Sequence, residues 1–487
     1  MRGSHDPVSS TGLIQPADVL RHPGHQGRRR WRRRKRARRQ PLITVLARRG
    51  DGPCRATAKK DEVAYWDLYD LTTDGLEGQT ADAEAKARRI LADDLSVAAA
   101  VVCPAMINGN TDTYKKIYDH QVNDWWTSLS EDEQNDIIAN NPDWIGNLNG
   151  VSLAARSEAN KNRLDAMKAE IDRQVKDFEP KTELQWTGYK FEYKNTSGYE
   201  AMLQRQKDID SLRDTFSYSE NPDKERIHSL LVLDNSGDHL RAAVGAGDID
   251  AADHVLVYTP GMTTTVAGSL VTGGKEFGAK VDEVERIMSE TGMPDHDDKN
   301  TEQVEETAAG VTWLGYDAPN WDETLKGSDG TVLSDHEAQS ASPDLAGFYD
   351  GIQATHTGDP HLVAAGHSYG STVTGYASQE SNAPDDIVVW GSPGASTVDA
   401  SDLNTVPDRM YSASATDDVV AGYGRYGGNP TTDPESDFTP LDTREHYEDG
   451  LRASAGHSLY TNAGTTSLHN LGNILADNGP DYPDPED

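Results

Sequence analysis

The sequence predicts an α/β fold in which a mostly parallel sheet, flanked by helices, follows a helical N-terminal region. From about residue 228 onward, short apolar runs that end at Gly, Pro or Asp alternate with polar stretches of helical periodicity. Before that point, Ala, Leu, Met, Lys and Glu recur at helical spacing, and the first 60 residues contain an arginine block that cannot pack. We therefore divide the 487 residues into a disordered basic arm (1–60), a helical region (61–226) and an α/β domain (227–487).

Seven apolar runs of the α/β domain have the length and residue types of strands. The first two are close enough for a hairpin, and helical crossovers require the later ones to be parallel. The best helices between them are Val271 to Glu290, Pro343 to His356 and Ser371 to Ser381. The expected strands are Ser229 to Asp234, Arg241 to Gly245, His254 to Thr259, Val311 to Tyr316, His361 to His367, Ile387 to Trp390 and Met410 to Ala415.

The region from about residue 61 to 225 is predicted to be mostly α-helical, with long stretches at Ala81 to Asp94 and Ser157 to Glu179. Ser130 and Glu133 have the spacing of a capping box, which predicts the start of a helix. Asn140-Asn141-Pro142 predicts the end of that helix. The tryptophans on either side of it are expected to be core anchors.

Charge also divides the chain. The formal net charge is −35, but residues 1–60 hold 17 basic and three acidic side chains, leaving 29 basic against 78 acidic ones thereafter. A body this acidic repels nucleic acid and anionic membranes, and it indicates halophilic adaptation or a strongly solubilised surface. We interpret the arm, which includes Arg28 to Arg36, as an expression leader or over-extended start. An arm that binds nucleic acid or lipid head groups is the alternative.

Neither a membrane span nor a metal site is expected. No stretch approaches the roughly 20 apolar residues that span a bilayer. The arginines are followed by only a short apolar run, Pro41 to Leu46, which is a poor secretory signal and favours a cytoplasmic location. Cys54 and Cys103 could form one disulfide at most and are not a metal-ligand pair. We expect no cofactor.

The most informative segment is an apolar strand that runs into Gly-x-Ser-x-Gly and then into a helix. The motif reads Gly366-His367-Ser368-Tyr369-Gly370. Its glycines permit a turn tight enough to lift the Ser368 hydroxyl clear of the sheet. The following helix directs its N-terminal dipole at the same point, where negative charge develops during acyl transfer. The segment predicts a nucleophilic serine.

Such a serine needs a histidine base and a carboxylate that orients it, in the chain order Ser, Asp, His. We choose Asp417 as the acid, with Asp418 as the runner-up, because both follow a strand at the sheet edge where ligands bind. We choose His457 as the base because it lies in a small-residue loop just before a helix. The alternatives are His446, in a charged stretch, and His469, inside that helix.

An oxyanion hole normally combines the amide after the nucleophile with an amide from the loop after an earlier strand. Pro260-Gly261 interrupts the strand that ends at Thr259, and small polar residues follow. We therefore expect the amides of Met262 and Tyr369 to hold the oxyanion.

The sequence resembles the mainly actinobacterial α/β-hydrolase family that was long catalogued as a domain of unknown function. The resemblance covers about residues 228–475 and extends more weakly to about residue 120. It implies an α/β-hydrolase fold and supports Ser368, Asp417 and His457 as a triad, but it implies no substrate. One departure is Asp417-Asp418-Val419, where the family more usually has Asp-Pro and an aliphatic residue. The matching motifs are Thr259 to Met262, Trp313 to Pro319, Gly366 to Ser371, Gly391 to Gly394, Gly456 to Tyr460 and Pro142 to Gly150.

The sequence thus favours a cofactor-independent serine hydrolase of the esterase or lipase type, acting on a small-molecule or lipid ester through an acyl-enzyme. An amidase or acyltransferase would use the same constellation. A non-catalytic protein that keeps the fold and binds a partner is the alternative from another class. The sequence does not indicate the oligomeric state.

Overall fold

The computed structural model describes residues 111–187, 189–219, 228–237, 239–271, 279–295, 306–319 and 334–484. All of them belong to one compact unit, Ala58–Asp487. The predicted arm (1–60), the predicted helix Ala81 to Asp94 and both cysteines lie outside the described residues. Most of the first half of the predicted helix Val271 to Glu290 also lies outside them.

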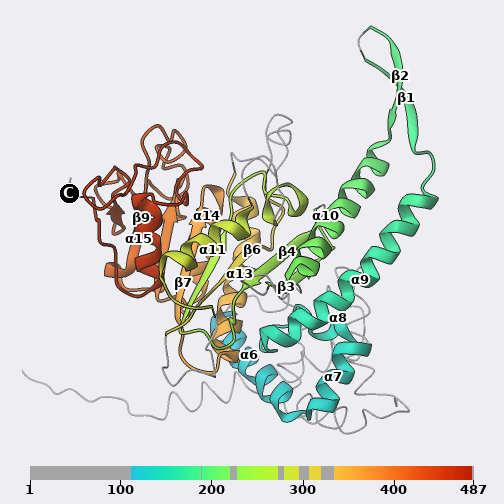
Figure 1. Cartoon of the computed structure of the whole chain (residues 1–487), viewed down its shortest axis with the longest axis horizontal. Helices are drawn as coiled ribbons and strands as arrows, with labels where there is room; N and C mark the ends of the chain where they lie inside the picture. Colours follow the sequence, from blue (N-terminus) through green and yellow to red (C-terminus); the bar gives the residue numbers. More distant parts are fainter. Residues whose placement is uncertain are drawn as a thin grey trace, which may run out of the picture. The chain divides into compact units, whose positions relative to one another are not determined.

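An eight-stranded sheet organises the C-terminal part of the described chain (Figure 1). Its strand order is β10-β9-β8-β7-β5-β6-β4-β3. Strand β4 runs antiparallel to both of its neighbours, β3 and β6, and the other neighbouring strands of this sheet are parallel, so the predicted hairpin and the predicted parallel strands are both confirmed. The strands are β3 (His228–Asp234), β4 (Arg241–Ala246), β5 (His254–Thr259), β6 (Ala308–Leu314), β7 (His361–His367), β8 (Asp386–Trp390), β9 (Met410–Ala413) and β10 (Thr439–Leu441).

The central strands are apolar along their whole length because helices cover both faces of the sheet. In β5, Val255 and Val257 contribute to the core on one face, whereas Leu256 and Tyr258 contribute to the core on the other. Residues of α9 (Leu153–Asp177), α10 (Ser197–Ser219), α13 (His336–Thr355) and α14 (Tyr369–Glu380) pack into the first core, and residues of α11 (Lys280–Glu290) and α15 (Thr466–Leu475) into the second.

Helix α13 begins earlier than the sequence predicts, since Pro343 lies inside it rather than at its start. A proline lacks the N–H that would bond the carbonyl four residues earlier, here the carbonyl of Gln339. The Ser342 hydroxyl lies 3.1 Å from that carbonyl and 2.8 Å from Glu380 Oε1, and its single proton can be donated to only one of them. The helix thus continues through the proline at the cost of one backbone hydrogen bond.

The helical region contains α6 (Thr111–Ser128), α7 (Glu131–Asn140) and α8 (Pro142–Ile145) before α9. The predicted capping box is confirmed, because the Ser130 amide donates to Glu133 Oε2 over 2.7 Å and the Glu133 amide donates back to Ser130 Oγ. Helix α7 ends at Asn140, as predicted. None of the described helices is both long and apolar enough to cross a bilayer.

Polar contacts join the helical region to the sheet. The Asp250 carboxylate accepts the amides of Leu153 and Ala154, each over 2.9 Å, and thereby caps the N-terminus of α9 from outside the helix. The buried Asn160 side chain donates to the carbonyl of Leu230 in edge strand β3 over 3.1 Å. Helix α9 is therefore fixed to the sheet near its own first turns.

A two-stranded antiparallel hairpin, β1 (Thr182–Trp186) and β2 (Phe191–Asn195), connects α9 to α10 (Figure 1). The expectation of a mostly helical region did not include it. Strand β10 was missed as well, because it has three residues and contains a proline, which strands tolerate only at edges.

Candidate active site

The turn between β7 and α14 presents Ser368 in a strained conformation. Ser368 has φ 55° and ψ −131°, outside the regions that residues with a Cβ ordinarily occupy. A Cβ on Gly366 would lie 2.5 Å from Ser371 Cα, and one on Gly370 would lie 2.1 Å from the Thr259 carbonyl oxygen. Both glycines are therefore required by close backbone approach, as the motif predicts.

His457 bridges Ser368 and an aspartate. Its Nε2 lies 2.8 Å from Ser368 Oγ, and its Nδ1 lies 2.9 Å and 3.0 Å from the two carboxylate oxygens of Asp418. A carboxylate can only accept, so Nδ1 carries the proton and Nε2 is left to accept from the serine hydroxyl. The three side chains form an unbroken hydrogen-bonded chain that leads away from the serine oxygen.

The acid in this chain is Asp418, so the choice of Asp417 was wrong. Asp417 is exposed and adopts a left-handed conformation with φ 65°, whereas the Asp418 side chain is completely buried. The left-handed residue turns the backbone after β9 so that the next side chain points inward. Two adjacent aspartates are chemically equivalent in the sequence, and only this backbone turn separates them.

Four hydrogen-bond donors, of which His457 is one, hold Asp418 as a carboxylate although its side chain is buried. Tyr460 donates its hydroxyl to Oδ2 over 2.6 Å, and the amides of Val420 and Ala421 donate to Oδ1 over 2.9 Å and 3.2 Å. Burial by itself would raise the pKa of Asp418, but the hydrogen bonds from His457 and Tyr460 outweigh it and lower the pKa to about 2. The group is thus ionised at neutral pH and can stabilise an imidazolium.

His367, the residue before the serine, is a contact of the site that sequence reasoning missed. Its Nε2–H donates to the backbone carbonyl of His457 over 2.7 Å, and the two rings lie 4.8 Å apart. Burial, followed by the charges of Lys280 and His457, lowers the pKa of His367 well below its usual value, so the ring is neutral. No sequence signal singled out this histidine beyond its place in the serine motif.

Gly391, the first residue of the motif Gly391 to Gly394, lies beside the acid and the base. It follows β8 at φ 57°, and a Cβ there would lie 3.0 Å from Asp418 Oδ2, 3.1 Å from His457 Nδ1 and 3.2 Å from His367 Nε2. The backbone therefore passes close to the acid and the base, where a side chain would be tightly packed and strained at this φ.

The loop after β5 lies directly against the serine. A Cβ on Gly261 would come within 2.6 Å of Ser368 Cβ, and the Tyr316 hydroxyl anchors the loop by donating to the Pro260 carbonyl over 2.7 Å. Met262 follows this contact and Tyr369 begins α14, so both predicted amide donors belong to segments that border Ser368.

The other two candidate histidines are engaged elsewhere. His446 Nε2 lies 3.2 Å from Asp442 Oδ2, and the ring of His446 packs on that of Tyr482. His469 contacts Asp481 and Glu290 through its two ring nitrogens. Of the three histidines weighed as bases, the structure brings His457 to the serine.

Within the described residues, one cluster has the spacing of metal ligands: His361, Asp386 and Asp477. His361 begins β7, whereas Ser368 follows its end, so the cluster lies at the other end of the strand. The Arg409 guanidinium donates to Asp386 over 3.2 Å and to Asp477 over 2.7 Å. An arginine already supplies the positive charge there, which makes the cluster an ion network rather than a metal site.

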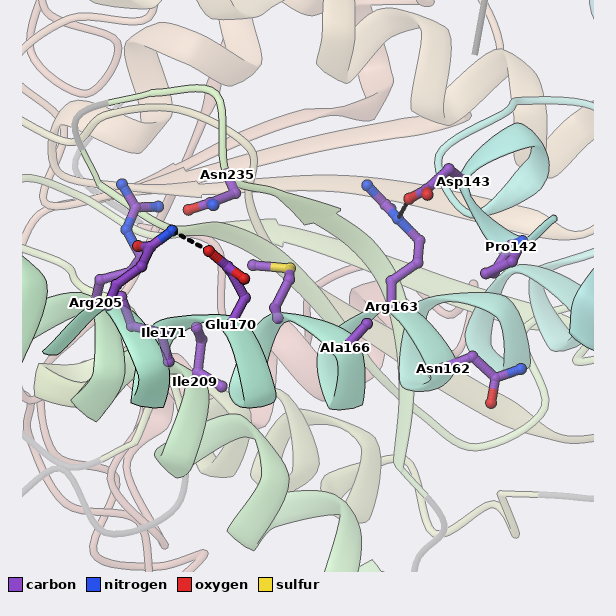
Figure 2. Close-up of a pocket in the computed structure, with 12 residues that line it drawn as sticks. Pro142, Asp143, Asn162, Arg163, Ala166, Glu170, Ile171, Arg205, Ile209 and Asn235 are labelled. Carbon is purple, nitrogen blue, oxygen red and sulfur yellow. Dashed lines mark hydrogen bonds and ion pairs between the residues drawn. The ribbon is translucent and has the colours of Figure 1, made fainter. Parts of the chain in front are cut away.

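A pocket of about 370 Å³ borders α8, α9 and α10 (Figure 2), and none of its lining residues belongs to the triad. Figure 2 shows Arg163 facing Asp143, to which it donates over 2.7 Å. Arg205 donates to the carbonyl of Gly237 over 3.0 Å. This pocket is therefore separate from the site that contains Ser368.

Comparisons with known proteins agree with this architecture. Residues 235–426 match a family model described as Alpha/beta hydrolase. An uncharacterised protein of Mycobacterium tuberculosis (strain ATCC 25618 / H37Rv) is 34% identical over 234 residues, which are 47% of this chain and 80% of that protein. A second uncharacterised protein of the same strain is 26% identical over 395 residues, 74% of this chain, but the match spans only 56% of that relative.

Two solved structures have low similarity to the chain. The esterase LipW from Mycobacterium marinum is 12% identical, with a TM-score of 0.29, over 58% of this chain and 91% of that one. A dienelactone hydrolase-like promiscuous phosphotriesterase from metagenomic libraries is 13% identical, with a TM-score of 0.30, over 52% of this chain and 99% of that one. The family match and the mycobacterial relative confirm the resemblance that the motifs indicate, and the chain belongs to the alpha/beta hydrolase family.

Proposed function

We propose that the protein is a serine hydrolase that cleaves carboxylic esters through an acyl-enzyme. The observation that carries this proposal is the continuous hydrogen-bonded chain from Ser368 Oγ through His457 to Asp418. We place the catalytic domain at residues 227–487. The active groups are all supplied by protein side chains and amides, so the proposed reaction needs no cofactor.

In the first half-reaction, Ser368 Oγ attacks the acyl carbonyl while His457 Nε2 takes its proton. The ionised Asp418 holds the resulting imidazolium. The amides of Met262 and Tyr369 stabilise the oxyanion, and α14 directs its positive end to the same point. Collapse of the intermediate expels the alcohol, which receives the proton from His457. Water then attacks the acyl-enzyme by the same route and releases the carboxylic acid.

The net charge of −35 disfavours anionic substrates, so a neutral ester is the preferred class. An amidase or an acyltransferase would use the same groups and differ in the leaving group or the acceptor. A non-catalytic protein of this family would have no use for an ionised acid oriented on a base that contacts a strained serine.

The test combines hydrolysis of p-nitrophenyl esters from acetate to palmitate with labelling by a fluorophosphonate probe, at low and at molar salt. We expect turnover and labelling by the wild type, and a loss of roughly 10⁶-fold in kcat for Ser368→Ala. Ser401→Ala, which removes an exposed hydroxyl, is the matched control and should behave as wild type.

Equal rates in the wild type and Ser368→Ala would refute Ser368 as the nucleophile. Labelling without ester turnover would favour the amidase or the acyltransferase. A folded protein that is neither labelled nor active would favour the non-catalytic binding protein.

A further inference from the structure

The β1–β2 hairpin has one apolar face. In its antiparallel register Leu184 pairs with Tyr193 and Trp186 pairs with Phe191, so these four side chains lie on the same face. Tyr189 extends the set into the turn. The alternate positions on the strands are polar or charged.

This face is exposed to solvent in the described structure. The exposed fractions are 55% for Leu184, 57% for Trp186, 64% for Phe191 and 76% for both Tyr189 and Tyr193. These five are half of the ten large apolar side chains that the described residues expose. Among the described elements, β1 and β2 have an extended contact only with each other.

Such an arrangement is unfavourable in water. A two-stranded hairpin is at best marginally stable by itself, and an apolar set of this size on a soluble surface marks an interaction site. The rings of Trp186 and Phe191 lie 5.0 Å apart, but this contact leaves most of both rings uncovered. The hairpin is therefore built to be covered by something else.

The charge of the hairpin differs from that of the rest of the chain. Residues 181–195 contain Lys181, Lys190 and Lys194 against Glu183 and Glu192, a net charge of +1 in a chain of −35. Lysines next to exposed aromatic rings are typical of segments at the boundary between lipid and water. Tryptophan and tyrosine favour that boundary because each has an apolar ring and a polar tip.

A second copy of the chain fits this face poorly. At roughly 150–250 Å² for a fully exposed ring, the five side chains together offer about 500–800 Å², which does not exceed the roughly 800 Å² that a stable protein interface takes from each partner. Pairing two hairpins would also bring together two chains that each carry a net charge of −35. A lipid surface does not require a minimum area from a protein partner. If its head groups carry no net charge, it also does not repel the acidic chain.

We propose that the β1–β2 hairpin docks the protein on a zwitterionic lipid surface, inserting Trp186, Tyr189 and Phe191 among the head groups with its lysines at the phosphates. This docking requires no chemistry at Ser368 and is independent of the proposed hydrolase activity.

The experiment measures flotation of the full chain with phosphatidylcholine vesicles, using Ser368→Ala as the background so that no lipid is hydrolysed. We expect the Trp186→Ser/Phe191→Ser pair to lower the partition coefficient at least tenfold. Tyr189→Ser changes the turn without altering the strand pairs, and it should lower binding several-fold with the hairpin intact. The control pair, Val406→Ser/Tyr447→Ser, removes two exposed apolar side chains elsewhere and should bind as well as the background.

Three results would overturn the proposal. One is the absence of vesicle binding by the folded background protein. Another is binding that falls equally in the hairpin and control pairs, or in neither. The third is a dimer, seen by sedimentation velocity, that dissociates in the hairpin pair, because the face would then be covered by a second copy. Every one of these results leaves the probe labelling of Ser368 in the wild type unaffected.

Discussion

The Ser368 edge of the sheet and the β1–β2 hairpin differ in what surrounds their side chains. At the sheet edge, His367, Ser368 and Asp418 are almost fully buried, and each has a hydrogen-bond partner. On the hairpin, large apolar side chains are more than half exposed. The geometry of the first region is complete without a ligand, whereas the second region leaves apolar surface uncovered. The difference suggests that chemistry and association are assigned to separate parts of the chain.

The largest effect on kcat should come from substitution of Asp418 at the sheet edge. Asp418→Asn would leave the shape but remove the negative charge and replace one acceptor oxygen by an NH2 donor, so the His457 tautomer would no longer be fixed, and we expect kcat to fall by about 10⁴-fold. Asp417→Asn removes one negative charge from the neighbouring exposed residue and should change kcat by less than about twofold. Ester hydrolysis by both variants is the measurement, and similar losses would refute the assignment of Asp418.

The same carboxylate should make stability depend on acid pH. The pKa of Asp418 in the folded protein, about 2, lies below its ordinary value of 3.8. Its contribution is therefore present above about pH 4 and is lost as pH falls through the folded pKa, with a total on the order of 2 kcal/mol. Urea unfolding at pH 5 and pH 2.5 should show the wild type losing its advantage over Asp418→Asn. A constant difference would contradict the pKa.

A smaller loss is expected at His367, which positions the loop of the base without touching the serine oxygen. His367→Phe keeps a buried ring but removes the hydrogen bond to the His457 carbonyl, so kcat should fall about three- to tenfold with KM unchanged. His367→Gln can place its amide nitrogen near the former Nε2 and should recover part of the rate. No recovery, together with a lowered melting temperature in both variants, would indicate a purely structural role.

The smallest effect on stability should come from the hairpin. Trp186→Ser/Phe191→Ser changes exposed side chains, so the free energy of unfolding should stay within about 0.5 kcal/mol of the wild type. Val257→Ala in the core of β5 should by contrast cost about 2 kcal/mol or more. Urea denaturation compares the two. A large loss in the hairpin variant would mean that its face is covered in solution by another part of the chain.

Sequence reasoning worked best where the local pattern and the tertiary environment agree. The central strands β5 and β7 are continuous apolar runs, and such runs are what a sheet covered on both faces requires. The turn at Ser368 was predictable from its two glycines. Any turn that joins a strand to a helix this sharply brings backbone atoms too close for a Cβ at these positions.

Prediction from the sequence failed where the position of a side chain depends on a single backbone turn or on contacts with residues far along the chain. The conformation of Asp417 decides which of two acids points inward, and nothing in the residue types reports it. His367 and Tyr460 matter through contacts with residues far along the chain. The hairpin was missed for another reason, because the alternation of apolar and polar residues from Leu184 onward was read as part of a helical region.

One loop contains both His457, the proposed base, and Tyr460, whose hydroxyl donates to the carboxylate of Asp418. His457 and Tyr460 are three residues apart, and both donate to the same carboxylate of Asp418. A graft that changes the length of this short stretch would remove the general base and misalign its partner in one step. We therefore expect relatives to tolerate loop exchange outside residues 457–460 but not within them. His457 and Tyr460 should be inherited together.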